Sequence, residues 1–204
     1  MSIRNLLKWA TRLASTLAVV PVLILHILKV PLLGKDRALE GSTQLLAIVP
    51  GISGQYLRQA LLAWTIQECH PTASIGFGTI FSKTAARIGE SVYIGPYCSF
   101  GSVTIERDAL IATGVHVLSG SKMHGIGDPT RPIREQPGEF VHVTLGAGCW
   151  IGAGAIVMAD VGRDSVIGAG AVVTKSIPEQ VIAAGVPAKV VRERITALVD
   201  PQSE

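Results

Sequence analysis

One histidine of this chain stands where an otherwise periodic sequence becomes irregular. From Val117 to Gly146 the chain reads VLSGSKMHGIGDPTRPIREQPGEFVHVTLG, and His124 lies in its first third. On both sides an aliphatic residue, often followed by Gly, recurs about every six positions. A histidine ring titrates near neutral pH, so it can take a proton from a weak nucleophile and return it to a leaving group. Because a long loop inside a regular repeat is costly to order and is usually functional, we take His124 as the candidate general base.

The remaining titratable groups of this kind have more ordinary interpretations. We expect His26 to be structural, because it lies in an apolar segment, and His70 to cap the start of the repeat before Pro71. His116 occupies the sixth place of a repeat unit, and His142 borders the site where the repeat resumes. Asp128 and Glu135 share the irregular stretch with His124, and either carboxylate is a candidate to orient its ring.

Composition excludes some classes of function. Of 204 residues, 48% are hydrophobic and 16% charged, with a net charge of +3. This balance is typical of a membrane-associated or densely packed repetitive protein, and without a basic stripe it does not favour nucleic acid as a partner. Cys69, Cys98 and Cys149 are odd in number and lack paired spacing. We therefore expect no disulfide framework, no zinc cluster and a reducing compartment.

The N-terminal segment differs from the rest. Residues 13–28 carry no charge, but sixteen residues are fewer than the roughly 20 needed to span a bilayer, and Pro21 interrupts them. Residues 1–40 hold six basic and two acidic side chains, a balance that suits an anionic cytoplasmic leaflet. We expect residues 1–50 to form an apolar helical segment that lies on or re-enters the membrane. The alternative is an apolar helix buried against the protein itself.

Residues 51–68 follow a helical period. Pro50 and Gly51 mark the start, and Ile52, Leu61 and Trp64 fall close to one face. We expect this amphipathic helix to pack on the next domain, with docking on lipid as the alternative.

Residues 69–187 contain a six-residue repeat. Ten units begin with a large apolar residue, at Ile75, Phe81, Ile88, Ile94, Ile105, Ile111, Leu145, Ile151, Val161 and Ile167. Four positions later comes a small or β-branched residue, at Thr79, Ala85, Val92, Cys98, Ala109, Val115, Cys149, Ala155, Ser165 and Ala171. The second position is Gly in seven of the ten units. Short strands with sharp corners, stacked so that each coil buries the next, satisfy this pattern. The repeat therefore predicts an all-β parallel β-helix with a loop at 119–143, in which Cys98 and Cys149 are inert core thiols.

Four segments carry a resemblance to a known family: VLSGSKMHG, CWIGAGAIV, VIGAGAVVTKSIP and AAGVPAKVVRER. Over residues 69–194 the chain resembles the left-handed β-helix acyltransferases with hexapeptide repeats, and most closely the O-acetyltransferases of sugars and bacterial surface polysaccharides. The resemblance implies a left-handed coil and a homotrimer with active sites between neighbouring subunits. It also implies that His124 is catalytic, since galactoside and maltose acetyltransferases carry a histidine soon after an aliphatic-Ser pair, here Leu118-Ser119. The spacing is one residue longer here, and Gly125 stands where a Pro often follows.

The same resemblance implies acetyl-CoA as the cosubstrate. Its contacts would be Trp150, Ala153 and Ala169 along the pantetheine arm, Thr174 and Lys175 as polar groups, and Lys189 and Arg192 at the phosphates. Apart from the resemblance, the only sign of a phosphate site is the basic cluster AKVVRER, and such a cluster is equally typical of a solvated cap. We expect residues 188–204 to form this cap and a tail with a short helix.

The function these observations predict is O-acetylation of a sugar hydroxyl in surface polysaccharide biosynthesis, without a metal. The acceptor would be a sugar or a lipid-linked polysaccharide, and the enzyme would sit on the cytoplasmic face of the inner membrane. One alternative is a β-helical zinc enzyme similar to carbonic anhydrase, with His116, His124 and His142 as ligands. The other is a non-catalytic membrane scaffold.

Overall fold

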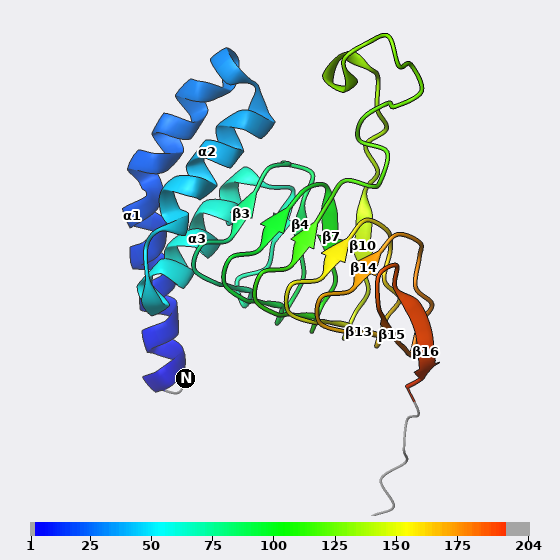
Figure 1. Cartoon of the computed structure of the whole chain (residues 1–204). Coiled ribbons are helices and arrows are strands. Elements are labelled where there is room, and N and C mark those ends of the chain that lie inside the picture. The colour runs from blue at the N-terminus through cyan, green and yellow to red at the C-terminus, as the bar shows by residue number, and fades with distance from the viewer. Residues whose placement is uncertain (1–2, 195–204) are drawn as a thin grey trace, which may run out of the picture.

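Three helices precede a stack of short strands (Figure 1). The structure is a computed structural model that describes residues 3–194, with side chains from residue 6 onward. The helices are α1 (Ile3–Leu33), α2 (Lys35–Ala47) and α3 (Gly51–Thr65), and a short 3-10 helix, η1, spans Ile133–Glu135. The strands are β1 (Glu68–Cys69), β2 (Ser74–Ile75), β3 (Ile80–Phe81), β4 (Arg87–Ile88), β5 (Tyr93–Ile94), β6 (Ser99–Phe100), β7 (Val103–Ile105), β8 (Leu110–Ile111), β9 (His116–Val117), β10 (Val143–Leu145), β11 (Trp150–Ile151), β12 (Ile156–Val157), β13 (Val166–Ile167), β14 (Val172–Val173), β15 (Val181–Ala184) and β16 (Lys189–Glu193).

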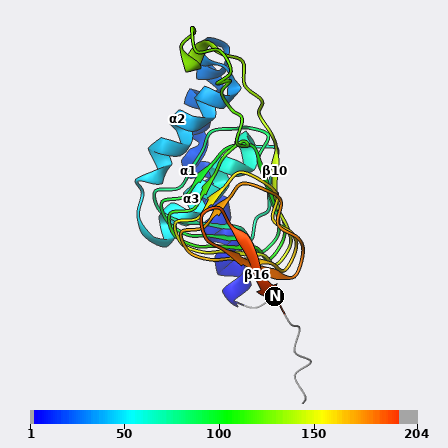
Figure 2. The ribbon, with the colours of Figure 1, turned by 45° about the vertical axis from the view of Figure 1, so that its right-hand side comes forward.

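The strands form three sheets that wrap one core, and they are parallel except for the last strand, β16. Face A has the order β1-β4-β7-β10, face B the order β16-β15-β13-β11-β8-β5-β2, and face C the order β14-β12-β9-β6-β3. Each turn of the chain visits the three faces and pairs with the turn before it, so that Ile94 lies beside Ile111 and Ile111 beside Ile151. The predicted parallel β-helix is confirmed, and the coils are visible side on in Figure 1 and partly end on in Figure 2.

The repeat fills the interior as predicted, with one exception. All ten large first positions are buried, and nine of the ten small positions are buried as well. The exception is Ala85, which is exposed, while Ala86 is fully buried. Seven residues separate Phe81 from Ile88 instead of six, so the extra residue moves the inward position by one. Phe81 stacks on Phe100 of the next coil with 4.7 Å between ring centroids.

Helices α2 and α3 close the first coil. Leu39 of α2 and Leu62 of α3 belong to the same buried cluster as the coil interior. Helix α1 packs on the outside of this pair, where Val19 lies in a second cluster with Leu46 and Leu61. The helices therefore form a cap in two layers, with α1 farthest from the coil (Figure 1).

Helix α1 is longer than the sequence indicated. It continues through Pro21 and Pro31, and its apolar part, Leu6–Leu33, has 28 residues and contains an 18-residue window with a mean hydropathy of 2.2. By length and composition it is long enough to cross a membrane, so the prediction of a segment too short to span was wrong. The length of the uncharged run was a poor guide to the length of the helix, because the helix also includes Lys8, Arg12 and Lys29. Neither proline ends it, and both lie on its exposed side.

Helix α3 packs on the coil as expected, but only part of the predicted face is buried: Leu61 is fully buried, whereas the two ends of that face are not. Ile52 and Trp64 are exposed by 72% and 69%, whereas Arg58 is buried. Its guanidinium donates from Nε to the carbonyl of Ile75 at 3.0 Å, and from Nη1 to those of Leu46 and Val49 at 3.1 and 2.7 Å. The carbonyls of Leu46 and Val49 lie at the C-terminal end of α2 and just after it, and that of Ile75 lies in β2 of the first coil. A charged side chain is therefore inside because it satisfies backbone groups that the apolar pattern does not show.

The C-terminal cap begins with a strand, and residues 188–194 do not form the short helix expected within 188–204. Strand β16 pairs antiparallel with β15, and residues 195–204 lie outside the described part of the chain. The edge of face B offers unpaired backbone groups at β15, and the β-branched Val190 and Val191 favour the extended conformation that pairs with them.

We predict that Arg58 holds the cap on the coil. Arg58→Met keeps the apolar stem but removes the hydrogen bonds to the carbonyls of Ile75, Leu46 and Val49, of which Leu46 still accepts the N–H of Val49, and this costs about 2–4 kcal/mol of unfolding free energy. Thermal unfolding followed by circular dichroism measures this loss. Arg87→Met, on exposed face A, is the matched control and leaves the melting temperature unchanged. Equal melting temperatures for the two variants would contradict this role.

Candidate active site

The irregular stretch forms an arm that leaves the coil between faces C and A. Strand β9 belongs to face C and β10 to face A, and residues 118–142 between them extend away from the coil (Figure 1). We call this corner the C–A edge. The coil continues beneath the arm, because β12 pairs with β9 and β10 pairs with β7. The arm is therefore an insertion that leaves the strand ladder complete.

The arm is held by pairing between its two sides. Val141 donates its backbone N–H to the carbonyl of Ser119 at 2.9 Å, and Glu139 donates to Lys122 at 2.8 Å. Farther out, the buried side chain of Gln136 donates to the carbonyls of Asp128 and Arg131 at 2.8 and 3.0 Å. Sequence reasoning missed Gln136, since nothing in its neighbours marks it as the polar centre of a loop.

His124 lies on the outgoing side of the arm and is exposed. Gly138 on the returning side packs directly against the backbone of Met123 and His124, with no space for a side chain. Neither proposed orienting carboxylate bonds to the ring. Asp128 accepts from the N–H and the hydroxyl of Thr130 at 2.9 and 2.6 Å, which lowers its pKa. The carboxylate of Glu135 forms an ion pair instead, with its Oε1 3.7 Å from Nε of Arg134. The expectation that Asp128 or Glu135 orients His124 is therefore not supported within the described residues.

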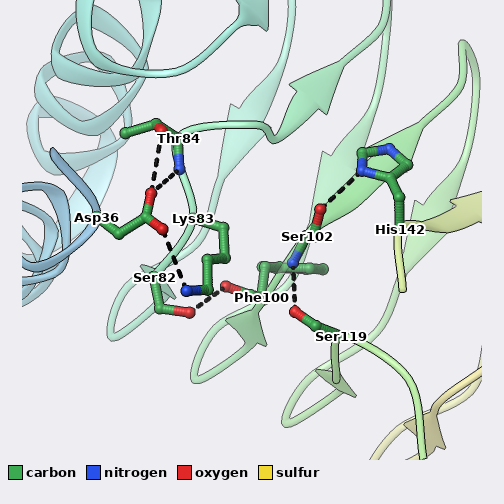
Figure 3. Close-up of polar contacts among 8 residues, drawn as sticks. All are labelled: Asp36, Ser82, Lys83, Thr84, Phe100, Ser102, Ser119 and His142. Carbon is green, nitrogen blue, oxygen red and sulfur yellow. Dashed lines mark hydrogen bonds and ion pairs between the residues drawn. The ribbon is translucent and has the colours of Figure 1, made fainter. Parts of the chain in front are cut away.

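His142, at the returning base of the arm, is held at both ring nitrogens. Nδ1 lies 2.8 Å from the hydroxyl of Ser102 (Figure 3), and Nε2 lies 2.8 Å from the hydroxyl of Thr104. Ser119 accepts the backbone N–H of Ser102 at 2.9 Å. These groups tie the base of the arm to the coil beneath it. Sequence reasoning missed these bonds of Ser102, Thr104 and Ser119, because the arm and the repeat separate the bonded partners along the chain.

The C–A edge also connects to the helical cap. Asp36 of α2 accepts from Lys83 at 3.1 Å, and from the N–H and hydroxyl of Thr84 at 3.0 Å each (Figure 3). Burial raises the pKa of Asp36, but the hydrogen bonds from Thr84 and Lys83 outweigh it and hold that pKa below its usual value. The Lys83 ammonium also lies 5.2 Å from the ring centroid of Phe140 in the arm. Cap, coil and arm therefore meet along one edge.

A second group of predicted residues lies on face B. Trp150 is half-exposed and stands in an outward row with Leu110 and Val166, its register partners. Arg192 pairs with Ile182, which pairs with Val166, so Arg192 and Trp150 lie three strands apart on one face, about 14 Å at the usual strand spacing.

The corner between faces B and C extends this group. Ala153 and Ala169 are exposed there on successive coils, where Gly170 donates its N–H to the carbonyl of Ala153 at 2.8 Å. Lys189 pairs with Ala184 at the same end of face B. The structure thus brings together Trp150, Ala153, Ala169, Lys189 and Arg192.

Thr174 and Lys175 lie elsewhere. They are exposed and follow β14, which places them on the C–A edge together with the arm that carries His124. Face C separates this edge from Ala153 and Ala169. Within one chain, the residues expected at the donor and the expected base therefore occupy two edges of the coil.

The cysteines and histidines favour no other chemistry. Burial raises the pKa of Cys69 and of Cys149 to about 12, and it also raises that of Cys98, so these thiols stay protonated at neutral pH. Across residues 3–194, no group of three or more His, Cys, Asp or Glu side chains is placed to hold a metal ion. His116 points outward from face C while His142 is bonded to two hydroxyls, so the trio required by the zinc alternative does not gather.

Comparison with known proteins agrees with this geometry. Residues 142–175 match the family described as bacterial transferase hexapeptide (six repeats). The chain is 31% identical over 164 residues to a galactoside O-acetyltransferase of Escherichia coli K12, covering 70% of this chain and 81% of that protein. This chain belongs to the hexapeptide-repeat transferase family.

Other members of the family extend the comparison. A putative lipopolysaccharide biosynthesis O-acetyl transferase of Escherichia coli K12 is 35% identical over 127 residues, covering 59% of this chain and 63% of that protein, so the match spans less than two thirds of this relative. A galactoside acetyltransferase solved in complex with coenzyme A has a TM-score of 0.66 at 26% identity, covering 82% of this chain and 83% of that one. A maltose O-acetyltransferase of Clostridium difficile 630 shares the fold, with a TM-score of 0.67 at 22% identity over 79% of this chain and 88% of that one.

We predict that Gly138 keeps the two sides of the arm paired in this transferase. In Gly138→Ala the new methyl group meets the backbone of Met123, so the arm opens while the coil is unaffected. Trypsin cleavage within the arm, at Lys122 and Arg134, becomes several-fold faster, and the melting temperature stays almost unchanged. Gly127→Ala, where a methyl group meets nothing within 4 Å, is the control. The same cleavage rate in both variants would show that the arm does not depend on this contact.

Proposed function

We propose that this transferase moves an acetyl group from acetyl-CoA to a sugar hydroxyl, with His124 as the general base. The observation that carries the proposal is the arm: a chain homologous to a galactoside O-acetyltransferase interrupts its coil with an insertion that presents the exposed His124 on its outgoing side. Surface polysaccharide is the acceptor class we favour, supported by the relative named for lipopolysaccharide biosynthesis.

The chemistry assigns one proton transfer to His124 in each direction. The neutral ring takes the proton of the acceptor hydroxyl as its oxygen bonds to the thioester carbonyl carbon, and the carbonyl electron pair moves onto oxygen. Backbone N–H groups at a coil corner are suitable donors to that oxyanion. When the tetrahedral intermediate collapses, the C–S bond breaks, and the departing thiolate takes the proton from the imidazolium. The products are an acetyl ester and coenzyme A.

The donor would bind along face B and its corner with face C. The exposed indole of Trp150 offers a flat apolar surface to a pantetheine arm, and Ala153 and Ala169 leave the adjacent corner uncrowded. Lys189 and Arg192, both exposed at the last strand, supply cations to phosphates. The related galactoside acetyltransferase complexed with coenzyme A supports this choice of donor.

A homotrimer would join the two edges that one chain keeps apart. Face B carries an exposed row of Tyr93, Leu110 and Trp150, each 44–49% accessible, which is an unusual surface to leave in water. If a neighbouring chain packs near this row, its C–A edge and arm can face the donor of the first chain. We therefore propose that each site is formed between subunits.

The helical cap supports membrane association. Only 11% of the residues in the most apolar 18-residue window of α1 are buried, and the outer side of the helix exposes Trp9, Leu17, Ile27 and Leu32. Cytosolic acetyl-CoA and unpaired cysteines fit a cytoplasmic orientation. We therefore propose that residues 1–50 hold the enzyme on the cytoplasmic face of the inner membrane, close to a lipid-linked acceptor.

His124→Ala tests the base. We expect kcat for acetyl transfer, measured by release of the coenzyme A thiol, to fall by about two to four orders of magnitude, as is typical when a general base is lost. His70→Ala is the matched control, because His70 bonds only to neighbouring Thr72 at the start of the coil. A kcat within threefold of wild type for His124→Ala would remove this residue from the mechanism.

Lys189→Ala/Arg192→Ala and Trp150→Ala test the donor site. The double variant raises KM for acetyl-CoA in a salt-sensitive way, because two cations facing phosphates are lost. Trp150→Ala weakens binding of coenzyme A without this salt dependence. Arg87→Ala/Arg107→Ala removes two exposed cations, one on face A and one at its corner with face B, away from the corner between faces B and C, and serves as the control. If coenzyme A binds all these variants equally, the donor site lies elsewhere.

A further inference from the structure

A polar groove lies where the N-terminal end of α1 passes α3 and the first coil. Its volume is about 290 Å³. Its polar lining residues include Lys8 and Arg12 of α1, Gln55 and Gln59 of α3, and Thr72 and Ser74 of the coil, and Ile52, Tyr56, Pro71 and Ala73 complete the lining. The groove is remote from the residues expected at acetyl-CoA, because β2 and β16 are the opposite ends of face B.

The charge of the groove favours an anion. Two cationic side chains line it, and no carboxylate is among its lining residues. The Nε atom of Arg12 is buried and has no hydrogen-bond partner within the described residues. Leaving such a donor unpaired costs free energy that a bound oxyanion restores, and side-chain amides and hydroxyls add further donors around it.

The position of the two cations on α1 matches the depth of a lipid headgroup. Lys8 and Arg12, four residues apart, continue the stripe of Ser15 and Val19 that faces the cap. The outer side of the same helix is apolar, with Leu13 and Leu17 among its exposed residues. When a helix lies with its apolar side at the acyl boundary, cations on the opposite side lie at the level of the phosphates. The groove then opens where a phospholipid phosphate is found.

We propose that this groove binds the phosphate of an anionic phospholipid and so fixes how the cap sits on the membrane. The proposal rests on the membrane association proposed above, since the lipid reaches the groove only if α1 lies in the interface. It adds a specific site to an attachment that the apolar side of α1 supplies without specificity.

The test compares two variants with the same loss of charge. Lys8→Gln/Arg12→Gln changes the groove, and Lys29→Gln/Lys35→Gln removes two cations from the other end of α1 and the start of α2. The full-length protein is mixed with vesicles of phosphatidylcholine alone, or of phosphatidylcholine with phosphatidylglycerol, and binding is measured by flotation. Circular dichroism checks that each variant is folded.

We expect wild type to bind both kinds of vesicle, and phosphatidylglycerol to raise its affinity by roughly tenfold or more, at about 1 kcal/mol for each cation. This gain disappears in Lys8→Gln/Arg12→Gln and largely remains in Lys29→Gln/Lys35→Gln. An equal loss in both variants would show diffuse attraction and overturn the site.

Two further outcomes separate the site from the proposals on which it rests. Binding of wild type to both vesicles with equal affinity overturns the phosphate site but keeps the membrane association, whereas binding to neither overturns both. A last experiment uses inorganic phosphate in place of vesicles. If it raises the melting temperature of wild type but not of Lys8→Gln/Arg12→Gln at millimolar concentration without vesicles, the ligand is a free phosphate and the lipid assignment is overturned.

Discussion

The backbone ladder between successive coils is the constraint on which the rest of this structure depends. It requires each turn of the chain to place an apolar residue above its predecessor, as Ile94, Ile111 and Ile151 do on face B. It also brings backbones together at the corners. A side chain on Gly95 would lie 2.8 Å from the carbonyl carbon of Ala112, so glycine is required there. The ladder ends at two open edges, and α2 and α3 cover one while β16 pairs with the other.

The same constraint explains why the arm can carry the chemistry. Paired positions on neighbouring coils are 17 residues apart at Ile94 and Ile111 and 16 apart at Ile151 and Ile167. The pair Ile111 and Ile151, between which the arm is inserted, is 40 residues apart. The surplus forms the arm, and the strands on either side of it pair as though it were absent. Residues in the arm are therefore free of the packing and register requirements that fix the coil. A polar, exposed His124 has little cost for the fold in this position, whereas in the interior column it would disrupt the stack.

The sequence predicted those parts of the structure that repeat. The inward columns, the glycine corners and the position of the arm all follow from a six-residue period, and only the extra residue before Ile88 displaced one position, from Ala85 to Ala86. Parts that depend on single contacts could not be predicted. The burial of Arg58 follows from carbonyls at the end of α2, and the bonds of His142 follow from hydroxyls about 40 positions away. For the same reason, the pairing of the arm by Gln136 and Gly138 has no signature in composition or period.

The central claim is that the coil folds and binds the donor without the arm, and that the arm supplies the catalytic group. It is tested most directly by replacing residues 123–138 with Asn-Gly. Lys122 and Glu139 already form a 2.8 Å backbone hydrogen bond, so a two-residue turn closes the strands that remain. Melting temperature, coenzyme A binding and acetyl transfer are measured on this protein and on wild type. We predict that the shortened protein melts within a few degrees of wild type and still binds coenzyme A, but transfers no acetyl group above background. Acetyl transfer at the wild-type rate, or a coil that fails to fold, would contradict the account.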